Sequence, residues 1–210
     1  MFLFSSLTSF LTFLIALLMA ITVHEFSHAA MADHLGDPTP RLTGRLTLNP
    51  FAHLDPIGTI MLFIFRFGWG KPVQIDPFNL QNPRRDQALI SLAGPGSNLI
   101  LAVFLSFLMR LMRPMGPMGL MGLMNPIILL NLALGIFNLL PIFPLDGFKI
   151  ASGLLSPEQA EQWDELRPFG PLILFLLIFP FFGQSIIGQL LFPIINWLLH
   201  FLLPYGYTGI

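Results

Sequence analysis

Two histidines and a glutamate stand within five residues of one another in "VHEFSHAAMADH", residues 23–34. His24 and His28 are four positions apart, so on a helix their side chains would be neighbours on one face. Two imidazoles at that spacing can bind one metal ion, and H-E-x-x-H is the pattern that zinc uses in metal-dependent hydrolysis. Glu25 would project to one side, where its carboxylate can take a proton from a water molecule at the metal. The pattern predicts a hydrolytic zinc site.

The alternative for this stretch is a pair of histidines that merely end a helix at an interface. Residues 1–23 carry no charged side chain, and the whole chain has only five histidines. An ionisable side chain costs about 2.5–3.5 kcal/mol at the centre of a bilayer. Three such groups together are therefore better explained by a chemical task.

A catalytic zinc takes three protein ligands and leaves one position for water. A second nearby glutamate cannot be the third ligand, because the next one after Glu25 is Glu158. His34 has the offset of the third ligand in H-E-x-x-H-x-x-G-x-x-H, but Met31 stands where that pattern needs glycine. A helix that continues past Met31 would carry His34 about 15 Å along the axis from His24. We therefore expect His34 at the helix end, facing water.

A distant aspartate is the better candidate for the third ligand. Asp146 is the only charged residue of "NLLPIFPLDGF", residues 138–148. Pro141 and Pro144 break a helix just before it, and Gly147 allows a sharp turn. The alternative is a turn aspartate at an interface, but a carboxylate at membrane depth needs a partner, and a metal ion supplies one.

The elements that must position these residues are apolar. The chain has 210 residues, of which 54% are hydrophobic and 10% charged, and its mean hydropathy is +0.75. A soluble domain normally carries about 25% charged residues, so we expect a protein embedded in the lipid bilayer. The net charge of −1 argues against nucleic acid as a partner. Cysteine is absent, which excludes disulfides and thiolate metal sites.

Four stretches approach the roughly 20 apolar residues that a spanning helix needs. They lie at about residues 7–31, 88–112, 120–140 and 171–203. The last is interrupted by Pro180, Gly183 and Pro193, so it is either one kinked helix or two shorter ones. The first lacks the basic region and cleavage site of a signal peptide, and we expect it to be retained. Residues 57–67 are too short to span, and we expect a re-entrant or interfacial segment.

Charge placement orients the helices. The lysines and arginines between the first two spans are Arg41, Arg45, Arg66, Lys71, Arg84 and Arg85. Lys149 and Arg167 follow the third span, and only Arg110 and Arg113 fall on the other side. The positive-inside rule then predicts a multi-pass protein of the cell membrane, with residues 35–87 and 148–168 in the cytosol. The first and third spans both run inward, so "HEFSH" and Asp146 lie at the same depth near the cytosolic side.

The loops carry weaker signals. "RLTGRLTLNP", residues 41–50, alternates Thr and Leu around Gly44 and predicts a short β-hairpin. The loop at residues 41–54 could accept an extended substrate as an added strand. We expect His53 and Asp55 to cap loops rather than to bind metal. "SPEQAEQWDELRP", residues 156–168, predicts a surface helix with Ser156 as N-cap and Pro157 at its first position.

With these residues in view, the sequence resembles the site-2 proteases, which are intramembrane zinc metalloproteases. The resemblance covers about residues 15–155. It rests on "HEFSH" and on "NLLPIFPLDG", which is similar to the family's N-x-x-P-x-x-P-L-D-G element, with support from "NPFAHLDPIGT", "GWGKP" and "AGPGSN". It implies that His24, His28 and Asp146 bind zinc and that Glu25 is the general base. It further implies that Asn138 and Asn98 orient the substrate or stabilise the oxyanion.

The resemblance also implies an architecture. We expect an all-α polytopic membrane protein with a three-helix catalytic core, extra C-terminal helices and a short β-hairpin-like re-entrant loop. Residues 1–210 would form one membrane-embedded domain, with the core at about 7–155 and the C-terminal helices at 156–210. "RPMGPMGLMGLM", residues 113–124, is too short for the PDZ domain that many relatives carry there. We expect a turn in its place, as in the small prokaryotic members.

The sequence therefore predicts an endopeptidase with one catalytic Zn²⁺ that cleaves transmembrane helices of client proteins in regulated intramembrane proteolysis. Two other classes stay open: a metal-dependent membrane hydrolase of a lipid or prenylated peptide, and a non-catalytic metal-binding membrane protein such as a transporter. A transporter would place ionisable residues along several spans, whereas here they cluster at one depth. A homo-oligomer is left open.

Overall fold

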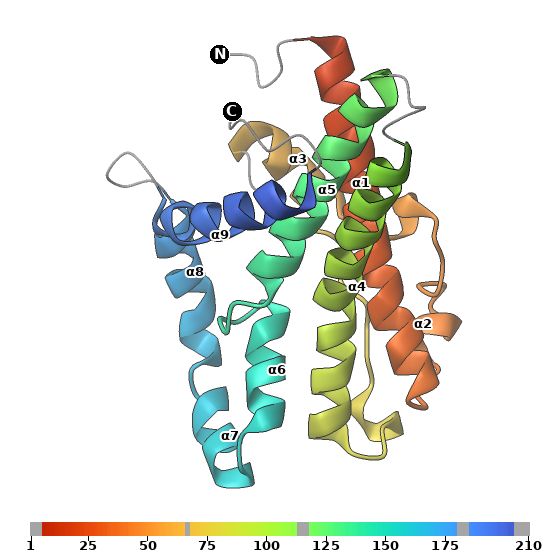
Figure 1. The fold of residues 1–210 in the computed structure, drawn as a ribbon. Coiled ribbons are helices and arrows are strands. Elements are labelled where there is room, and N and C mark those ends of the chain that lie inside the picture. Colours follow the sequence, from red (N-terminus) through yellow and green to blue (C-terminus); the bar gives the residue numbers. More distant parts are fainter. Residues whose placement is uncertain (1–5, 66–67, 113–117, 180–184, 204–210) are drawn as a thin grey trace.

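The computed structural model describes residues 6–65, 68–112, 118–179 and 185–203, which are helices and loops without a β-strand in these ranges. The predicted all-α class is therefore confirmed. Three long helices lie side by side in Figure 1: α1 (Leu7–His34), α4 (Pro83–Met112) and α5 (Met118–Asn138). α1 and α5 run toward one end of the molecule, and α4 runs the opposite way.

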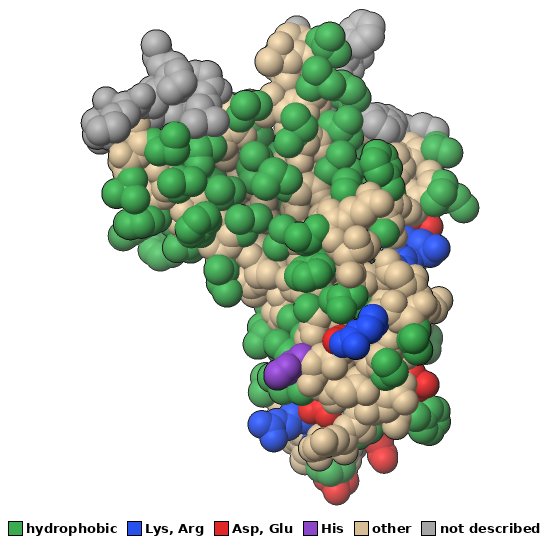
Figure 2. Space-filling model, turned by 90° about the vertical axis from the view of Figure 1, so that its right-hand side faces the viewer, with side chains coloured by type: hydrophobic (Ala, Val, Ile, Leu, Met, Phe, Trp, Pro, Cys, Tyr) green, Lys and Arg blue, Asp and Glu red, His purple; other side chains and the backbone are tan. Residues whose placement is uncertain are grey.

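The long helices suit a lipid bilayer. α1 and α4 are long and apolar enough to cross a membrane, and α5 is apolar over Leu123–Asn138. Figure 2 shows hydrophobic side chains over the upper part of one face, while most charged side chains gather toward the lower end. Small buried residues on α1 let the neighbouring helices approach closely; they are Ala16, Ala20, Ala29 and Ala32.

α1 continues through the position where the pattern H-E-x-x-H-x-x-G-x-x-H needs a glycine. The helix passes Met31 without a break and ends at His34, as predicted. Gly36 then adopts a φ of +107°, which lets the amide of Asp37 donate to the carbonyl of Ala32 at 2.9 Å. This is the usual way in which a glycine closes the end of a helix.

The short apolar stretch forms α3 (Pro56–Phe65) in a re-entrant loop. Leu54 and Gly70 form an isolated antiparallel bridge, and the amide of Lys71 donates to the carbonyl of His53 at 2.8 Å. The chain therefore leaves and returns at the same place, as expected of a re-entrant or interfacial segment. Arg66 and Phe67 of the predicted stretch lie outside the described residues.

The β-hairpin expected at residues 41–50 is wrong. Its start belongs to the short helix α2 (Thr39–Leu42), because Pro38 and Pro40 hold their φ angles in the range that begins a helix. Gly44, with a φ of +70°, then turns the chain. The alternation of Thr and Leu is outweighed by these prolines, and residues 43–48 offer no strand edge.

α5 ends at Asn138, where the proline-rich stretch begins, and the chain continues into α6 (Asp146–Leu154) and α7 (Pro157–Asp164). The predicted surface helix is confirmed, since Ser156 and Gln159 form a reciprocal capping box at the start of α7. Residues 113–117 of the expected turn lie outside the described residues, and α5 already begins at Met118. Among the described residues, the connections between helices also contain three short 3-10 helices: η1 (Pro50–Ala52), η2 (Pro77–Asn79) and η3 (Arg167–Phe169).

The C-terminal stretch forms two helices, α8 (Gly170–Ile178) and α9 (Ile186–Leu202). The expected interruptions Pro180 and Gly183 lie outside the described residues, whereas Pro193 is inside α9. α9 crosses the long helices in Figure 1 and packs Ile195 and other apolar residues against α4 and α5. Arg110 of α4 donates to the carbonyls of Phe201 and Leu202, which lack partners within α9.

Asp37 joins the end of α1 to the segment before α4. Its buried carboxylate accepts hydrogen bonds from the amides of Thr39 and Asp76, at 3.0 and 2.8 Å, and from Nδ2 of Asn79 at 2.9 Å. Burial by itself would raise the pKa of this carboxyl. The hydrogen bonds outweigh burial and hold the pKa of Asp37 below its usual value.

We predict that Asp37→Ala lowers the free energy of unfolding by about 1–3 kcal/mol at neutral pH, because buried donors lose their acceptor. The folded pKa lies below the unfolded value of about 3.9. The stabilisation is therefore present above that pH and is lost as the pH falls through the folded pKa. Thermal unfolding in detergent, measured from about pH 7 to pH 3, should show the difference between wild type and variant shrinking in acid. A difference that grows in acid would contradict this account.

Candidate metal centre

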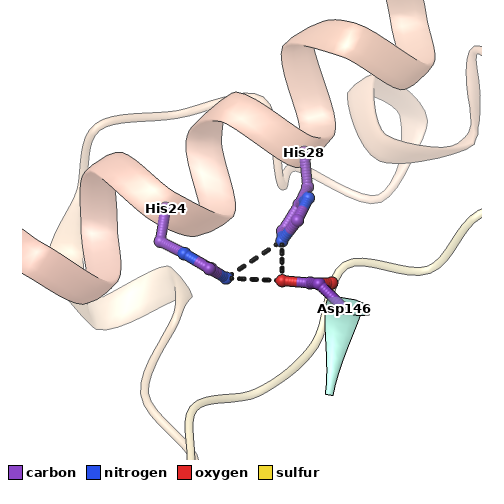
Figure 3. Close-up of side chains that lie close together, drawn as sticks. All are labelled: His24, His28 and Asp146. Carbon is purple, nitrogen blue, oxygen red and sulfur yellow. Dashed lines mark hydrogen bonds and ion pairs between the residues drawn. The ribbon is translucent and has the colours of Figure 1, made fainter. Parts of the chain in front are cut away.

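α1 presents His24 and His28 on one face, and the start of α6 brings Asp146 to meet them (Figure 3). Oδ2 of Asp146 lies 3.1 Å from Nε2 of His24 and 3.2 Å from Nε2 of His28, and the two Nε2 atoms are 3.0 Å apart. The imidazole planes are nearly perpendicular, at 88°. Among the residues that the structure describes, no other His, Cys, Asp or Glu side chains are grouped closely enough to share a metal ion.

Hydrogen bonds on the far side of each ring fix which nitrogen faces the centre. Nδ1 of His24 lies 2.6 Å from Oδ1 of Asn98, and Nδ1 of His28 lies 2.7 Å from the carbonyl oxygen of Ile90. Both oxygens only accept, so each Nδ1 carries a hydrogen, and in the neutral ring that zinc binds each Nε2 offers a lone pair.

The donor set fits zinc. Two nitrogen lone pairs and a carboxylate oxygen face one another within 3.2 Å, an arrangement that repels itself unless a cation lies between the atoms. Ligand atoms about 2.0–2.1 Å from a tetrahedral zinc are about 3.3 Å apart, which is close to these spacings. His24, His28 and Asp146 are therefore the residues that would hold the ion.

Gly94 of α4 leaves room for both imidazoles. A Cβ atom at this position would lie 2.3 Å from Nε2 of His28 and 2.8 Å from Cε1 of His24. No side chain larger than hydrogen fits without moving the rings. The sequence shows a glycine within an apolar span, but it does not show that imidazoles take up the space.

The turn before α6 aims the carboxylate of Asp146. A Cβ atom on Gly147 would lie 2.3 Å from the carbonyl oxygen of Leu140 and 2.4 Å from that of Leu139. The chain can fold back this tightly because glycine follows the aspartate. Asp146 thus becomes the first residue of α6 and points toward α1 (Figure 3).

Glu25 lies beside the centre, at a cavity of about 160 Å³ that the three ligating side chains also line. The extended segment of residues 71–75 forms another wall, and the amide of Val73 donates to Oε2 of Glu25 at 3.2 Å. The carboxylate therefore faces the same space as the ligand atoms, which is the position that a general base needs.

Two buried residues hold the 71–75 segment in place. The carbonyl of His53 accepts the hydrogen bond from Lys71, and the guanidinium of Arg45 donates to the carbonyl of Lys71 at 3.4 Å. Asp55 caps α3, since its Oδ1 accepts from the amide of Gly58 at 2.7 Å. His53 and Asp55 thus have the loop-holding positions expected from the sequence, away from the metal centre.

The three remaining candidate residues from the sequence, Asn138, Asn98 and His34, lie in different surroundings. Asn138 lines the cavity; its Nδ2 donates one hydrogen to the carbonyl of Leu134 at 3.0 Å, and the other is available to a substrate. Asn98 is fully buried and does not line this cavity, so its expected contact with substrate does not fit its position. His34 ends α1 and is not part of the ligand cluster.

Asn131 was missed by the sequence reasoning. It is fully buried on α5, and its Oδ1 accepts a hydrogen bond of 2.7 Å from Nδ2 of Asn98. The signal available in the sequence was an amide within an apolar span, seven residues before Asn138. Nothing in the pattern shows which helix such an amide faces.

Comparisons with known proteins also indicate a zinc metalloprotease. The model of peptidase family M50 matches residues 115–177. "Putative zinc metalloprotease YwhC" of Bacillus subtilis (strain 168) is 38% identical over 172 residues, which are 79% of this chain and 78% of that protein. "Putative zinc metalloprotease Rip2" is 30% identical in Mycolicibacterium smegmatis and 32% in Mycobacterium tuberculosis H37Rv, covering 88% and 86% of this chain and 71% and 70% of theirs. No solved structure shows significant similarity.

We predict that Gly94→Ala weakens zinc binding at least tenfold, because the new methyl group must displace both imidazoles. Gly96→Ala is the matched control, since it lies two residues further along α4 and a Cβ atom there meets nothing within 4 Å. Zinc per chain would be measured by elemental analysis after equilibration with a chelator. Equal zinc retention by the two variants would show that Gly94 does not set the position of the rings.

Proposed function

Because this chain belongs to peptidase family M50, the site-2 proteases, we propose that it is an endopeptidase that cuts transmembrane helices of client proteins within the bilayer. Family membership makes it a membrane-embedded zinc metalloprotease. The observation that carries the finer proposal is that His24, Glu25 and His28 lie inside α1, a helix apolar and long enough to cross a membrane. A peptide bond that reaches them has to come from a segment that is itself at membrane depth.

The residues divide the chemistry among them. His24 and His28 through Nε2, and Asp146 through Oδ2, would hold the ion. Bound zinc supplies a Lewis acid that lowers the pKa of water and polarises the scissile carbonyl. Glu25 takes the proton from the attacking water and gives it to the leaving nitrogen as the C–N bond breaks. The free hydrogen on Nδ2 of Asn138 would stabilise the developing oxyanion.

The size of the cavity supports a locally unwound substrate. About 160 Å³ beside Glu25 cannot hold a helix, whose diameter with side chains is about 10–12 Å. A transmembrane substrate must therefore unwind to bring one peptide bond to the centre. The extended 71–75 segment lies along the cavity, and we propose that it, rather than residues 43–48, takes the unwound strand alongside it.

The other classes have less support. The relatives are named as zinc metalloproteases, and none of their names refers to a lipid substrate. A transporter would need a path of ionisable groups through several helices, and the described residues contain one cluster of metal-binding groups at a single depth. We also propose that residues 1–210 form one membrane-embedded domain with its catalytic core at about 7–155.

The proposal predicts distinct effects of two substitutions. Wild type, Glu25→Gln and Asp146→Ala would be purified in detergent, analysed for zinc, and assayed with a transmembrane peptide. We expect about one zinc per wild-type chain. Glu25→Gln should keep the zinc and lose cleavage by at least 100-fold, because its amide cannot take the proton. Asp146→Ala should lose both zinc and cleavage.

Three experimental results would contradict this proposal. Zinc that stays bound without Asp146 would mean that the third ligand is another residue. Cleavage that survives in Glu25→Gln would remove the general base from the mechanism. A wild-type enzyme that cleaves a lipid or prenylated substrate but no helical peptide would favour the second hydrolase class.

We further propose that the charged lower end, with α7, faces the cytosol of a multi-pass protein, and that the site lies within the membrane near this side. The absence of native cysteine makes this directly testable. Gln162→Cys on exposed α7 should be protected from a membrane-impermeant maleimide in intact cells and react after lysis. Thr8→Cys at the start of α1 should react in both cases. The reverse labelling pattern would invert the orientation.

A further inference from the structure

We propose that Asn131 is a positioning residue that acts through Asn98 to hold His24 in the tautomer and orientation that metal binding requires. The inference rests on the zinc site proposed above. It assigns a role to a buried amide on α5 that makes no contact with the cavity or with any of the three ligand atoms.

An ordered chain of hydrogen bonds connects α5 to the metal centre. Nδ2 of Asn131 donates to the carbonyl of Ile127 at 2.8 Å, and Oδ1 of Asn131 accepts from Nδ2 of Asn98 at 2.7 Å. The other hydrogen on Nδ2 of Asn98 goes to the carbonyl of Ala20 at 2.9 Å. Oδ1 of Asn98 is left to accept from Nδ1 of His24 at 2.6 Å.

The direction of these hydrogen bonds, from Asn131 through Asn98 to His24, determines whether His24 can bind a metal. If the amide of Asn98 were reversed, its NH₂ group would face Nδ1 of His24. That ring would then need a lone pair on Nδ1 and a hydrogen on Nε2, and such a nitrogen cannot bind a metal. Reversal would also bring Oδ1 of Asn98 against two acceptor oxygens, those of Asn131 and Ala20. Asn131 therefore opposes the orientation that would block Nε2.

The two histidines differ in how firmly they are held, and this difference explains why only one needs such a chain. Nδ1 of His28 donates to the backbone carbonyl of Ile90, which cannot change from acceptor to donor. Nδ1 of His24 faces a side-chain amide, which can present either its oxygen or its NH₂ group. A second amide with a fixed direction removes that freedom.

Because Asn98 and Asn131 are buried, water cannot take over their hydrogen bonds if one of them is replaced. Both Asn98 and Asn131 have no exposed surface, and their neighbours along α4 and α5 belong to the apolar core, among them Ala102, Ile128 and Leu132. A leucine at position 131 would suit such surroundings better if packing were the only requirement, because it brings no polar group to satisfy. The amide is understandable where its hydrogen bonds set the orientation of another group.

A double-mutant cycle with cobalt as the probe tests the proposal. Asn98→Leu, Asn131→Leu and the double variant would be titrated with Co²⁺ in detergent, following the absorption bands of the bound ion. Asn196→Leu is the matched control, since Asn196 is also an amide in an apolar helix but its Oδ1 has no partner. Thermal melting of each metal-free variant separates loss of fold from loss of metal.

We expect Asn98→Leu to weaken Co²⁺ binding by about 10–100-fold, the range of outer-shell effects. Asn131→Leu should weaken it by about 3–10-fold, less than that range, because Asn131 acts on His24 only through Asn98. The double variant should bind no more weakly than Asn98→Leu, because Asn131 acts only through Asn98. Asn131→Asp should restore most of the affinity. The carboxyl group of this variant keeps an oxygen that can accept from Nδ2 of Asn98. Asn196→Leu should bind as wild type does.

Three results would overturn the inference. The first is a Co²⁺ affinity of Asn131→Leu within twofold of wild type. The second is a double variant whose loss equals the product of the single losses, which would make the residues independent. The third is an Asn131→Asp variant that binds as weakly as Asn131→Leu. A wild-type protein that binds no metal would remove the proposed zinc site together with this inference. Zinc binding with unaffected Asn131→Leu would remove the inference alone.

Discussion

The structure depends on one unfavourable arrangement: two nitrogen lone pairs and a carboxylate oxygen are held within 3.2 Å of one another among apolar helices. In water such groups would separate or change their hydrogen-bonding partners. In surroundings of low dielectric constant their mutual repulsion is stronger, and a divalent cation changes it into attraction. The fold must keep the three groups together, and it does so with rigid parts: the four-residue spacing on α1, the turn at Gly147, and the space left by Gly94.

These parts share a physical basis in close backbone approach. Small residues on α1 and Gly94 on α4 bring two helices near enough for the imidazoles to lie between them. Once the helices are this close, polar groups such as the Nδ1 atoms can only be satisfied by specific partners, because water has no room. The hydrogen bonds behind the rings are therefore a consequence of the packing that creates the site, and they also determine which nitrogen faces the metal.

The sequence predicted the parts of this site that local chemistry determines. The spacing of His24 and His28, the proline break before Asp146 and the shortness of the α3 stretch each follow from residues that are neighbours in the chain. Asn131, Gly94 and the contact of Val73 with Glu25 could not be found in this way, because each depends on which helix or loop lies opposite. The predicted hairpin failed for a related reason: the Thr and Leu alternation at residues 41–50 competed with prolines that favour a helical turn.

Hydrolysis also requires water, and the position of the site accounts for its supply. Lys149, one turn after Asp146, lines both the catalytic cavity and a neighbouring polar cavity of about 330 Å³ that reaches Arg84 and Glu161 at the charged end. The opposite side of the site is formed by the apolar helices α1, α4 and α5. Under the proposed function, water would reach the site from the polar side and a transmembrane substrate from the apolar side. His24, His28 and Asp146 lie where the polar and the apolar surroundings meet.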